Sequence, residues 1–312
     1  MARCFITRTL PGSAVERLSE AGHAVDIWPE RMPPTTAEMI SRIGGAEGLL
    51  CMLTDEITAD LLGSAADLKV VSNMAVGCDN IDLIACRDRG VHVGNTPGVL
   101  TDATADLALA LMLAISRRLP EGMSAVRSGD WKTWEPNFLL GMELRDRTLG
   151  IVGAGRIGNA VSARARAFGM EVIQSGRPDG PTPGLPLTQM LAQADIVSVH
   201  CPLTEETRGL VDASFLATMQ KHALLINTSR GQVVNQTALA AALSNGDIAG
   251  AALDVTDPEP LPSDDPLLTA PNLIVTPHLG SATNRTREAM ASIAVDNLLA
   301  GLAGSPLPHP VI

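Results

Sequence analysis

A glycine-rich turn at residues 153–158 constrains the fold of this chain more than any other feature. It reads Gly-Ala-Gly-Arg-Ile-Gly and follows an apolar strand pattern at residues 148–152. A helical pattern continues from the turn to Gly169, and a second apolar strand pattern follows at residues 171–174. Strand, glycine turn, helix and strand in this order are typical of a βαβ unit that binds a dinucleotide. An ordinary glycine turn is the alternative, and the order of the flanking elements disfavours it.

The glycines of this turn have separate physical roles in such a unit. Gly153 permits a tight turn, Gly155 lets the backbone approach a pyrophosphate, and Gly158 lets helix and strand pack closely. The N–H groups at the start of the helix, at the positive end of its dipole, can then bind the phosphates. We therefore expect the cofactor to contact Gly153, Gly155, Arg156, Ile157 and Gly158.

The end of the second strand indicates which dinucleotide binds. Units specific for NAD place an Asp or Glu about 20 residues after the glycines, where it binds the adenosine ribose hydroxyl. This chain has Ser175, Gly176 and Arg177 at that point. A guanidinium can bind the 2′-phosphate of NADP(H), and these three residues include no carboxylate to repel it. We therefore expect NADP(H) to be preferred; the alternative is a solvated Arg177 and continued use of NAD(H).

Composition and charge exclude several other classes of protein. With 23 Lys and Arg against 34 Asp and Glu, the net charge of −11 argues against nucleic acid or a membrane as the main partner. The densest apolar run, residues 107–115, is too short to span a bilayer and predicts a buried helix. Five cysteines without a C-x-x-C pair are typical of reduced thiols in the cytoplasm. The sequence has no residues with zinc-ligand spacing, so we expect no metal.

Strand and helix patterns alternate in two series, at residues 4–93 and 148–275. Alternation of this kind predicts parallel sheets covered by helices on both faces. Between the series, a long helix is expected at residues 102–119, with Thr101 as its N-cap and Pro120 beyond its end. The fold class is therefore α/β with two doubly wound domains, a Rossmann cofactor domain and a flavodoxin-like substrate domain.

An aromatic segment interrupts the alternation at residues 129–144. It contains Trp131, Trp134 and Phe138, although the whole chain has only three Trp, four Phe and no Tyr. Aromatic residues are enriched at protein interfaces. This segment is therefore a candidate interface arm, and an intramolecular loop packed on its own domain remains the alternative.

Polar residues stand at the ends of three later apolar strand patterns. Arg230 follows the first, Asp254 ends the second with Glu259 five residues later, and His278 follows the third. Ligands of open α/β sheets bind at the carboxyl ends of the strands. Together these side chains fit an anion clamp beside an acid–base pair, because a carboxylate favours a charged, oriented imidazole. His200, at the end of another strand pattern, is the rival histidine.

With these segments the chain resembles the D-isomer-specific 2-hydroxyacid dehydrogenases. The resemblance covers nearly the whole chain and rests on Val76-Gly77-Cys78-Asp79-Asn80-Ile81-Asp82, Asn95-Thr96-Pro97-Gly98, the glycine turn, Asn227-Thr228-Ser229-Arg230-Gly231, Asp254-Val255, Pro258-Glu259-Pro260 and Pro277-His278-Leu279-Gly280-Ser281. Within the family it looks most like the glyoxylate/hydroxypyruvate reductases, through Asn73-Met74-Ala75-Val76-Gly77, Trp131-Lys132-Thr133-Trp134 and Ser175-Gly176-Arg177. Cys78 departs from the family, which commonly has a larger aromatic or aliphatic residue there.

The resemblance implies a reaction and roles for its residues. The reaction would be NADPH-dependent reduction of small 2-oxoacids, glyoxylate to glycolate and hydroxypyruvate to D-glycerate. Arg230 would bind the carboxylate and polarise the ketone, His278 would donate the proton, and Glu259 would keep His278 charged. The backbone N–H groups of Val76 and Gly77 would hold the far side of the carboxylate.

The resemblance also implies the remaining contacts. Asp254 would orient the nicotinamide carboxamide, while Thr228 and Pro202 would line its site. Beyond the glycine turn and residues 175–177, the expected cofactor contacts are Thr104, Cys201, Pro202, Thr228, Ser229, Arg230, Asp254, His278 and Gly280, and Ser281 would join the substrate contacts.

The resemblance further suggests a domain organisation. The substrate domain would comprise residues 1–98, completed by a returning segment at 282–312, and the Rossmann domain residues 99–281. Closure of the cleft between them would assemble the site and exclude water, and the protein would be a homodimer. Two other functions remain open: a dehydrogenase of another 2-hydroxy acid, such as D-lactate, or a non-catalytic corepressor-like protein that senses NAD(P).

Overall fold

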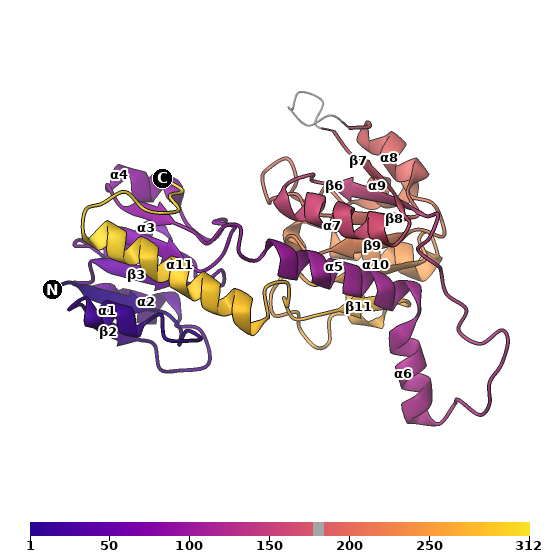
Figure 1. Ribbon diagram of the computed structural model, residues 1–312, viewed down its shortest axis with the longest axis horizontal. Coiled ribbons are helices and arrows are strands. Elements are labelled where there is room, and N and C mark those ends of the chain that lie inside the picture. The colour runs from indigo at the N-terminus through magenta and orange to yellow at the C-terminus, as the bar shows by residue number, and fades with distance from the viewer. Residues whose placement is uncertain (177–183) are drawn as a thin grey trace. The chain divides into compact units, whose positions relative to one another are not determined.

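A computed structural model describes residues 1–176 and 184–312 of the chain (Figure 1). It divides into two compact units. Unit 1 comprises Met1–Leu100 and Ala282–Ile312, and unit 2 comprises Thr101–Ser281. Each unit is built around its own parallel sheet, so the expected α/β class with two doubly wound domains is confirmed.

Unit 1 contains a five-stranded parallel sheet in the order β2-β1-β3-β4-β5. Its strands are β1 (Arg3–Ile6), β2 (Ala24–Ile27), β3 (Gly48–Cys51), β4 (Val70–Asn73) and β5 (His92–Gly94). The strand order reverses between β1 and β3, as in the flavodoxin-like arrangement. β3 and β4 are buried throughout, which is expected of parallel strands covered on both faces.

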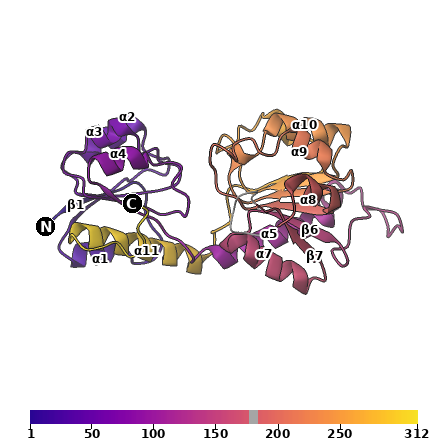
Figure 2. The same ribbon diagram turned by 90° about the horizontal axis from the view of Figure 1, so that it is seen from above.

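Helices cover both faces of this sheet. They are α1 (Glu16–Glu20), α2 (Thr36–Ile43), α3 (Ala59–Gly63), α4 (Leu83–Asp88) and α11 (Asn284–Leu302). Figure 2 shows α2, α3 and α4 on one face, with α1 and α11 on the other. The helix α2 begins at a capping box, in which Thr35 and Glu38 each bind the other's backbone N–H. The last helix of the chain therefore belongs to the unit that the first strand begins.

Unit 2 contains a six-stranded parallel sheet in the order β11-β10-β9-β8-β6-β7. Its strands are β6 (Thr148–Val152), β7 (Glu171–Gln174), β8 (Ile196–Val199), β9 (Leu224–Asn227), β10 (Gly250–Leu253) and β11 (Leu273–Val275). The order reverses between β6 and β8, at the carboxyl end of the strand that leads into the glycine turn. Ligands of open α/β sheets bind at such a switch point.

The helices of unit 2 form two layers, of which Figure 2 shows α5 and α7 on one face of the sheet and α9 and α10 on the other. The bounds are α5 (Thr101–Ser116), α6 (Leu119–Ser128), α7 (Arg156–Ala167), α8 (Leu187–Gln193), α9 (Ala213–Thr218) and α10 (Gln236–Asn245), with short 3-10 turns at Gly231–Val233 and Pro266–Thr269. As expected, the apolar run at residues 107–115 lies in the largely buried helix α5.

One helix differs from its expected extent. The helix expected at residues 102–119 ends at Ser116, and a second helix, α6, begins at Leu119. Arg118 separates them with a φ of 52°, a left-handed conformation that ends α5. Pro120 lies in the first turn of α6. Backbone N–H groups in the first turn have no carbonyl partner within the helix, so the lack of an N–H in proline costs no helical hydrogen bond there.

No helix in the described part of the chain combines the length and the apolar character that crossing a membrane requires.

Candidate active site

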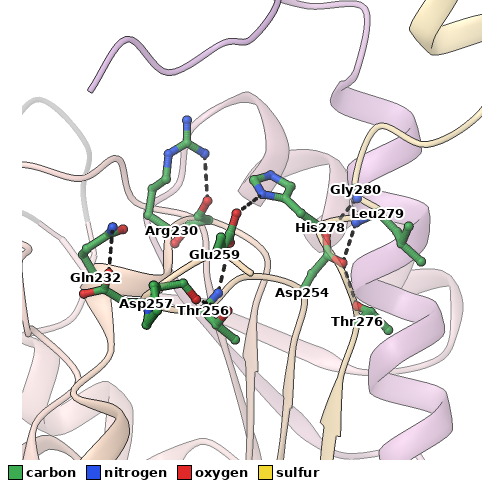
Figure 3. Close-up of polar contacts among 12 residues, drawn as sticks. Arg230, Gln232, Asp254, Thr256, Asp257, Glu259, Thr276, His278, Leu279 and Gly280 are labelled. Atoms are coloured by element: carbon green, nitrogen blue, oxygen red, sulfur yellow. Dashed lines mark hydrogen bonds and ion pairs between the residues drawn. The ribbon is translucent and has the colours of Figure 1, made fainter. Parts of the chain in front are cut away.

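Three neighbouring strands of unit 2 bring the expected polar side chains to one edge of the sheet. Arg230 follows β9, Asp254 follows β10 and His278 follows β11, and these strands are adjacent and parallel. Their carboxyl ends therefore meet at the same edge. In Figure 3 the side chains of Arg230 and His278 project to the same side, and Glu259 lies between them.

His278 and Glu259 form a hydrogen-bonded pair. The Nδ1 atom of His278 lies 2.8 Å from Oε2 of Glu259 (Figure 3). The other oxygen, Oε1, accepts a hydrogen bond of 3.0 Å from the backbone N–H of Thr256, which fixes the carboxylate. An ionised carboxylate can only accept hydrogen bonds, so Nδ1 carries the hydrogen. The Nε2 atom of His278 is left to face a reactant.

Asp254 is buried, and its carboxylate binds groups on both sides of His278. Its Oδ1 accepts hydrogen bonds from the N–H of Leu279 at 2.7 Å and from the hydroxyl of Thr276 at 2.6 Å, and its Oδ2 accepts from the N–H of Gly280 at 2.8 Å. His278 itself has a φ of 54°, an uncommon conformation that this network stabilises. The sequence interpretation missed this role, although a carboxylate directly after an apolar strand was a signal for it.

The sequence interpretation gave no role to Asn227, which shapes the turn carrying Arg230. Its Oδ1 accepts from the N–H and the hydroxyl of Ser229, at 3.0 and 2.8 Å, and its Nδ2 donates to the carbonyl of Arg230 at 2.9 Å. Asn227 is buried at the end of an otherwise apolar strand, and that pattern was the signal in the sequence. The guanidinium of Arg230 donates to the carbonyl of Ser229 at 2.9 Å.

Gly231 brings the Arg230 turn against the loop that carries Glu259. A Cβ atom at this position would overlap the backbone carbonyl of Thr256 and crowd the N atom of Asp257. Only glycine therefore lets the loop after β9 lie this close to the loop after β10. The contact places the Arg230 and Glu259 loops side by side.

The glycine turn after β6 fits a pyrophosphate. Gly153 has a φ of 95°. A Cβ atom there would overlap the backbone of Cys201, in the loop after β8, which is a neighbour of β6 in the sheet. A Cβ on Gly158 would overlap the carbonyl of Gly153. Gly155, in contrast, faces open space, and as the N-cap of α7 it has no side chain to cap the helix. The N–H groups of Arg156, Ile157 and Gly158, in the first turn of the helix, are therefore available to an anion.

Several expected cofactor contacts line the same edge of unit 2. The hydroxyl of Thr104, near the start of α5, donates to the carbonyl of Gly280 at 3.2 Å. The hydroxyl of Thr228 lies 3.4 Å from Nδ1 of His200. Pro202, another expected cofactor contact, directly follows Cys201 in the chain. Ser281, an expected substrate contact, directly follows Gly280.

The rival histidine, His200, is a poor proton donor. Desolvation by burial lowers its pKa to about 4, so the ring is neutral near pH 7. Its Nε2 lies 2.8 Å from the hydroxyl of Ser198, and its Nδ1 faces Thr228. Both ring nitrogens therefore face protein hydroxyls, which favours a structural role for this side chain.

The end of β7 is described only in part. The hydroxyl of Ser175 donates weakly to the carbonyl of Ile151 at 3.4 Å. Gly176 lies so close to Gly184 that a Cβ atom on Gly176 would come within 2.9 Å of the N atom of Gly184. This close packing within the chain accounts for a glycine at position 176. Arg177, which the cofactor expectation invoked, lies outside the described residues.

Val76 and Gly77 lie in unit 1, in the loop after β4. The side chain of Val76 is 39% exposed, and Gly77 and Cys78 are half-buried. Among residues 1–176 and 184–312, no group of three His, Cys, Asp or Glu side chains is placed to hold a metal ion.

Comparisons with known proteins bear on this site. Residues 109–280 match the family model described as "D-isomer specific 2-hydroxyacid dehydrogenase, NAD binding domain". The human glyoxylate reductase/hydroxypyruvate reductase is 43% identical over 99% of this chain and 97% of its own length. A crystal structure of a protein from Thermus thermophilus superposes with a TM-score of 0.94 at 49% identity, covering 99% of this chain and 100% of that one.

A second solved structure with a similar fold contains bound ligands. The NADPH-dependent glyoxylate/hydroxypyruvate reductase of Sinorhizobium meliloti, in complex with NADP and malonate, has a TM-score of 0.87 and 33% identity. The similarity covers 99% of this chain and 96% of that structure's chain.

Proposed function

Because the chain belongs to the D-isomer specific 2-hydroxyacid dehydrogenase family, we propose that it reduces glyoxylate and hydroxypyruvate with NADPH as the preferred reductant. Membership makes the protein an NAD(P)-dependent oxidoreductase. One observation carries the proposal to a reaction: Arg230, the Glu259–His278 pair and the glycine turn all lie at the carboxyl edge of one sheet. A protein that only sensed the nucleotide would have no use for the hydrogen-bonded acid–base pair.

The residues have distinct parts in the proposed reaction. A bound nicotinamide cofactor would supply the hydride for the 2-carbonyl carbon. Arg230 binds the carboxylate of the 2-oxoacid and polarises its 2-carbonyl group. His278 delivers a proton from Nε2 to the 2-carbonyl oxygen, while its Nδ1–H remains bonded to Glu259, which gives the imidazolium a counter-charge. In unit 1, the backbone N–H groups of Val76 and Gly77 are proposed as donors to a substrate carboxylate.

Initial rates with a panel of 2-oxoacids, each with NADPH and with NADH, test the proposal. We expect glyoxylate and hydroxypyruvate to have the highest kcat/KM. Faster turnover of pyruvate would favour the D-lactate alternative. Absence of turnover with every 2-oxoacid, despite NADPH binding, would favour the corepressor-like alternative.

Cofactor preference gives a sharp prediction. Wild type should favour NADPH over NADH by at least about tenfold in kcat/KM, because a charge-assisted hydrogen bond to the 2′-phosphate contributes roughly that factor. The double variant Ser175→Asp with Arg177→Ala should reverse the preference, since it adds repulsion and removes the cation. Kinetics with both cofactors measure this, and Ser305→Asp, an exposed serine in unit 1, is the control. Equal use of both cofactors by the wild type would contradict the prediction.

We further propose that the protein is a homodimer that pairs through an arm formed by α6 and residues 129–144. Figure 1 shows this arm extending away from the sheet of unit 2. Most of its large apolar side chains are exposed, namely Leu119, Met123, Val126, Trp131, Trp134, Phe138 and Leu140. Apolar groups gathered in this way mark protein interaction sites, and a second copy of the same chain would bury them.

We also propose that the protein is cytoplasmic, because its five cysteines would stay reduced in that compartment.

Substitution within the arm tests the dimer. Trp134 is 80% exposed in the chain, so Trp134→Glu should leave each chain folded but weaken pairing, because a charge would be buried at the interface. Sedimentation equilibrium should give twice the chain mass of 32.6 kDa for wild type and a shift toward one chain for the variant. Ile84→Glu, at a 69% exposed position of unit 1, is the matched control. A monomeric wild type would refute the proposal.

A further inference from the structure

The loop after β4 has a regular pattern of hydrogen bonds to its carbonyl groups. The carbonyl of Ala75 accepts from the backbone N–H of Thr96 at 2.9 Å, and the carbonyl of Val76 accepts from the side-chain amide of Asn95 at 2.7 Å. The carbonyl of Gly77 accepts from the side-chain amide of Asn73 at 2.9 Å. Three successive carbonyls of this loop are therefore bound by protein donors.

These bonds fix the direction of the N–H groups between them. In a trans peptide the N–H of a residue points opposite to the carbonyl of the residue before it, and the peptides of this loop are trans. The N–H of Val76 thus points away from Thr96, and the N–H of Gly77 points away from the amide of Asn95. Within the described residues, neither N–H donates to a protein acceptor. The loop presents two oriented donors.

Asn95 is itself held from both sides by the last part of the chain. Its backbone N–H donates to the carbonyl of His309 at 3.2 Å, and its carbonyl accepts from the side-chain amide of Asn297 at 2.9 Å. Asn297 lies fully buried in α11, and its own oxygen accepts from the N–H of His309 at 3.1 Å. The neighbouring Gly94 leaves room for it, because a Cβ there would come within 2.7 Å of the Asn297 amide.

We propose that Asn95 is a positioning residue for substrate binding: its amide holds the Val76–Gly77 peptide so that the Gly77 N–H faces the 2-oxoacid carboxylate. This inference rests on the proposed function. A donor that is already oriented binds an anion without a cost of reorganisation. Without the amide, the carbonyl of Val76 has no side-chain donor and the peptide can rotate, so the carboxylate loses an aligned N–H.

The variant Asn95→Ala tests this proposal in the full-length protein. The KM for glyoxylate and the inhibition constant of oxalate, which presents a similar carboxylate, should both rise about tenfold, the loss of roughly one hydrogen bond to a charged group. The kcat at saturating glyoxylate and the dissociation constant of NADPH should stay within about twofold of wild type by this reasoning. Asn95→His, whose ring N–H can reach the same carbonyl, should recover part of the loss.

Asn284→Ala, an exposed asparagine of the same unit, is the matched control and should leave all four quantities unchanged. An unchanged KM and oxalate constant in Asn95→Ala would overturn the inference. Equal damage in Asn95→Ala and Asn95→His, together with a lower melting temperature, would also overturn it, because the role would then be structural. If wild type reduced no 2-oxoacid, the proposed function would fail, and calorimetry of oxalate binding with NADPH present would still test the role of Asn95 separately.

Discussion

The variant His278→Asn is expected to fold and to bind NADPH, yet to lose about 10²- to 10⁴-fold in kcat for glyoxylate reduction, the usual contribution of general acid catalysis. Asparagine can keep a hydrogen bond to Glu259, which now lies 2.8 Å from Nδ1, but it offers no titratable proton at the position of Nε2. Steady-state kinetics give the loss, and fluorescence titration with NADPH checks cofactor binding.

His200→Asn is the matched control for this prediction. His200 also stands at a strand end of unit 2, but burial lowers its pKa to about 4, and its ring faces Ser198 and Thr228. Its substitution should cost far less activity than that of His278. A loss below threefold in His278→Asn would assign the proton to His200 or to water, and the proposed mechanism would be wrong.

Arg230→Lys should reduce activity much more than retention of the charge suggests. A planar guanidinium can bind a carboxylate and reach the 2-carbonyl oxygen at once, whereas an ammonium is a single point of charge. Losing one charge-assisted contact typically costs about tenfold to a hundredfold. We expect the KM for glyoxylate to rise and kcat to fall together, because the lost contact serves both binding and polarisation of the 2-carbonyl group.

The same exchange at an exposed arginine is the control, because it shows what an Arg-to-Lys substitution does to the kinetics away from the proposed site. Arg145→Lys, in unit 2, keeps the charge at a surface position and should behave as wild type. Near-normal constants in Arg230→Lys would show that Arg230 acts through its charge alone.

Much of the fold follows from local patterns in the sequence. The α/β class was predictable because strand and helix periods alternate, and the turn at residues 153–158 is the basis of the proposed cofactor site in unit 2. The proposed roles of Arg230 and His278 could be argued from sequence because the carboxyl ends of parallel strands meet at one edge. That rule uses only the position of a residue relative to its strand.

Features that depend on the conformation of a single residue or on the identity of a hydrogen-bond partner were not predictable. The break between α5 and α6 depends on the left-handed conformation of Arg118, and no glycine marks it. Asn227 and Asp254 act through hydrogen bonds to the loops around them, and a polar residue at a strand end does not reveal which backbone groups it binds. The contact of Asn297 with Asn95 joins residues 202 positions apart.

The return of α11 to unit 1 has a consequence for how the protein is made. All of unit 2 has been synthesised once Ser281 is in place, whereas the sheet of unit 1 still lacks the helix that covers β3 and β4. Domains fold as units during synthesis, and contacts between distant segments form slowly. Unit 2 can therefore fold as soon as its last residues have been made, whereas unit 1, whose synthesis begins earlier, is completed only by α11.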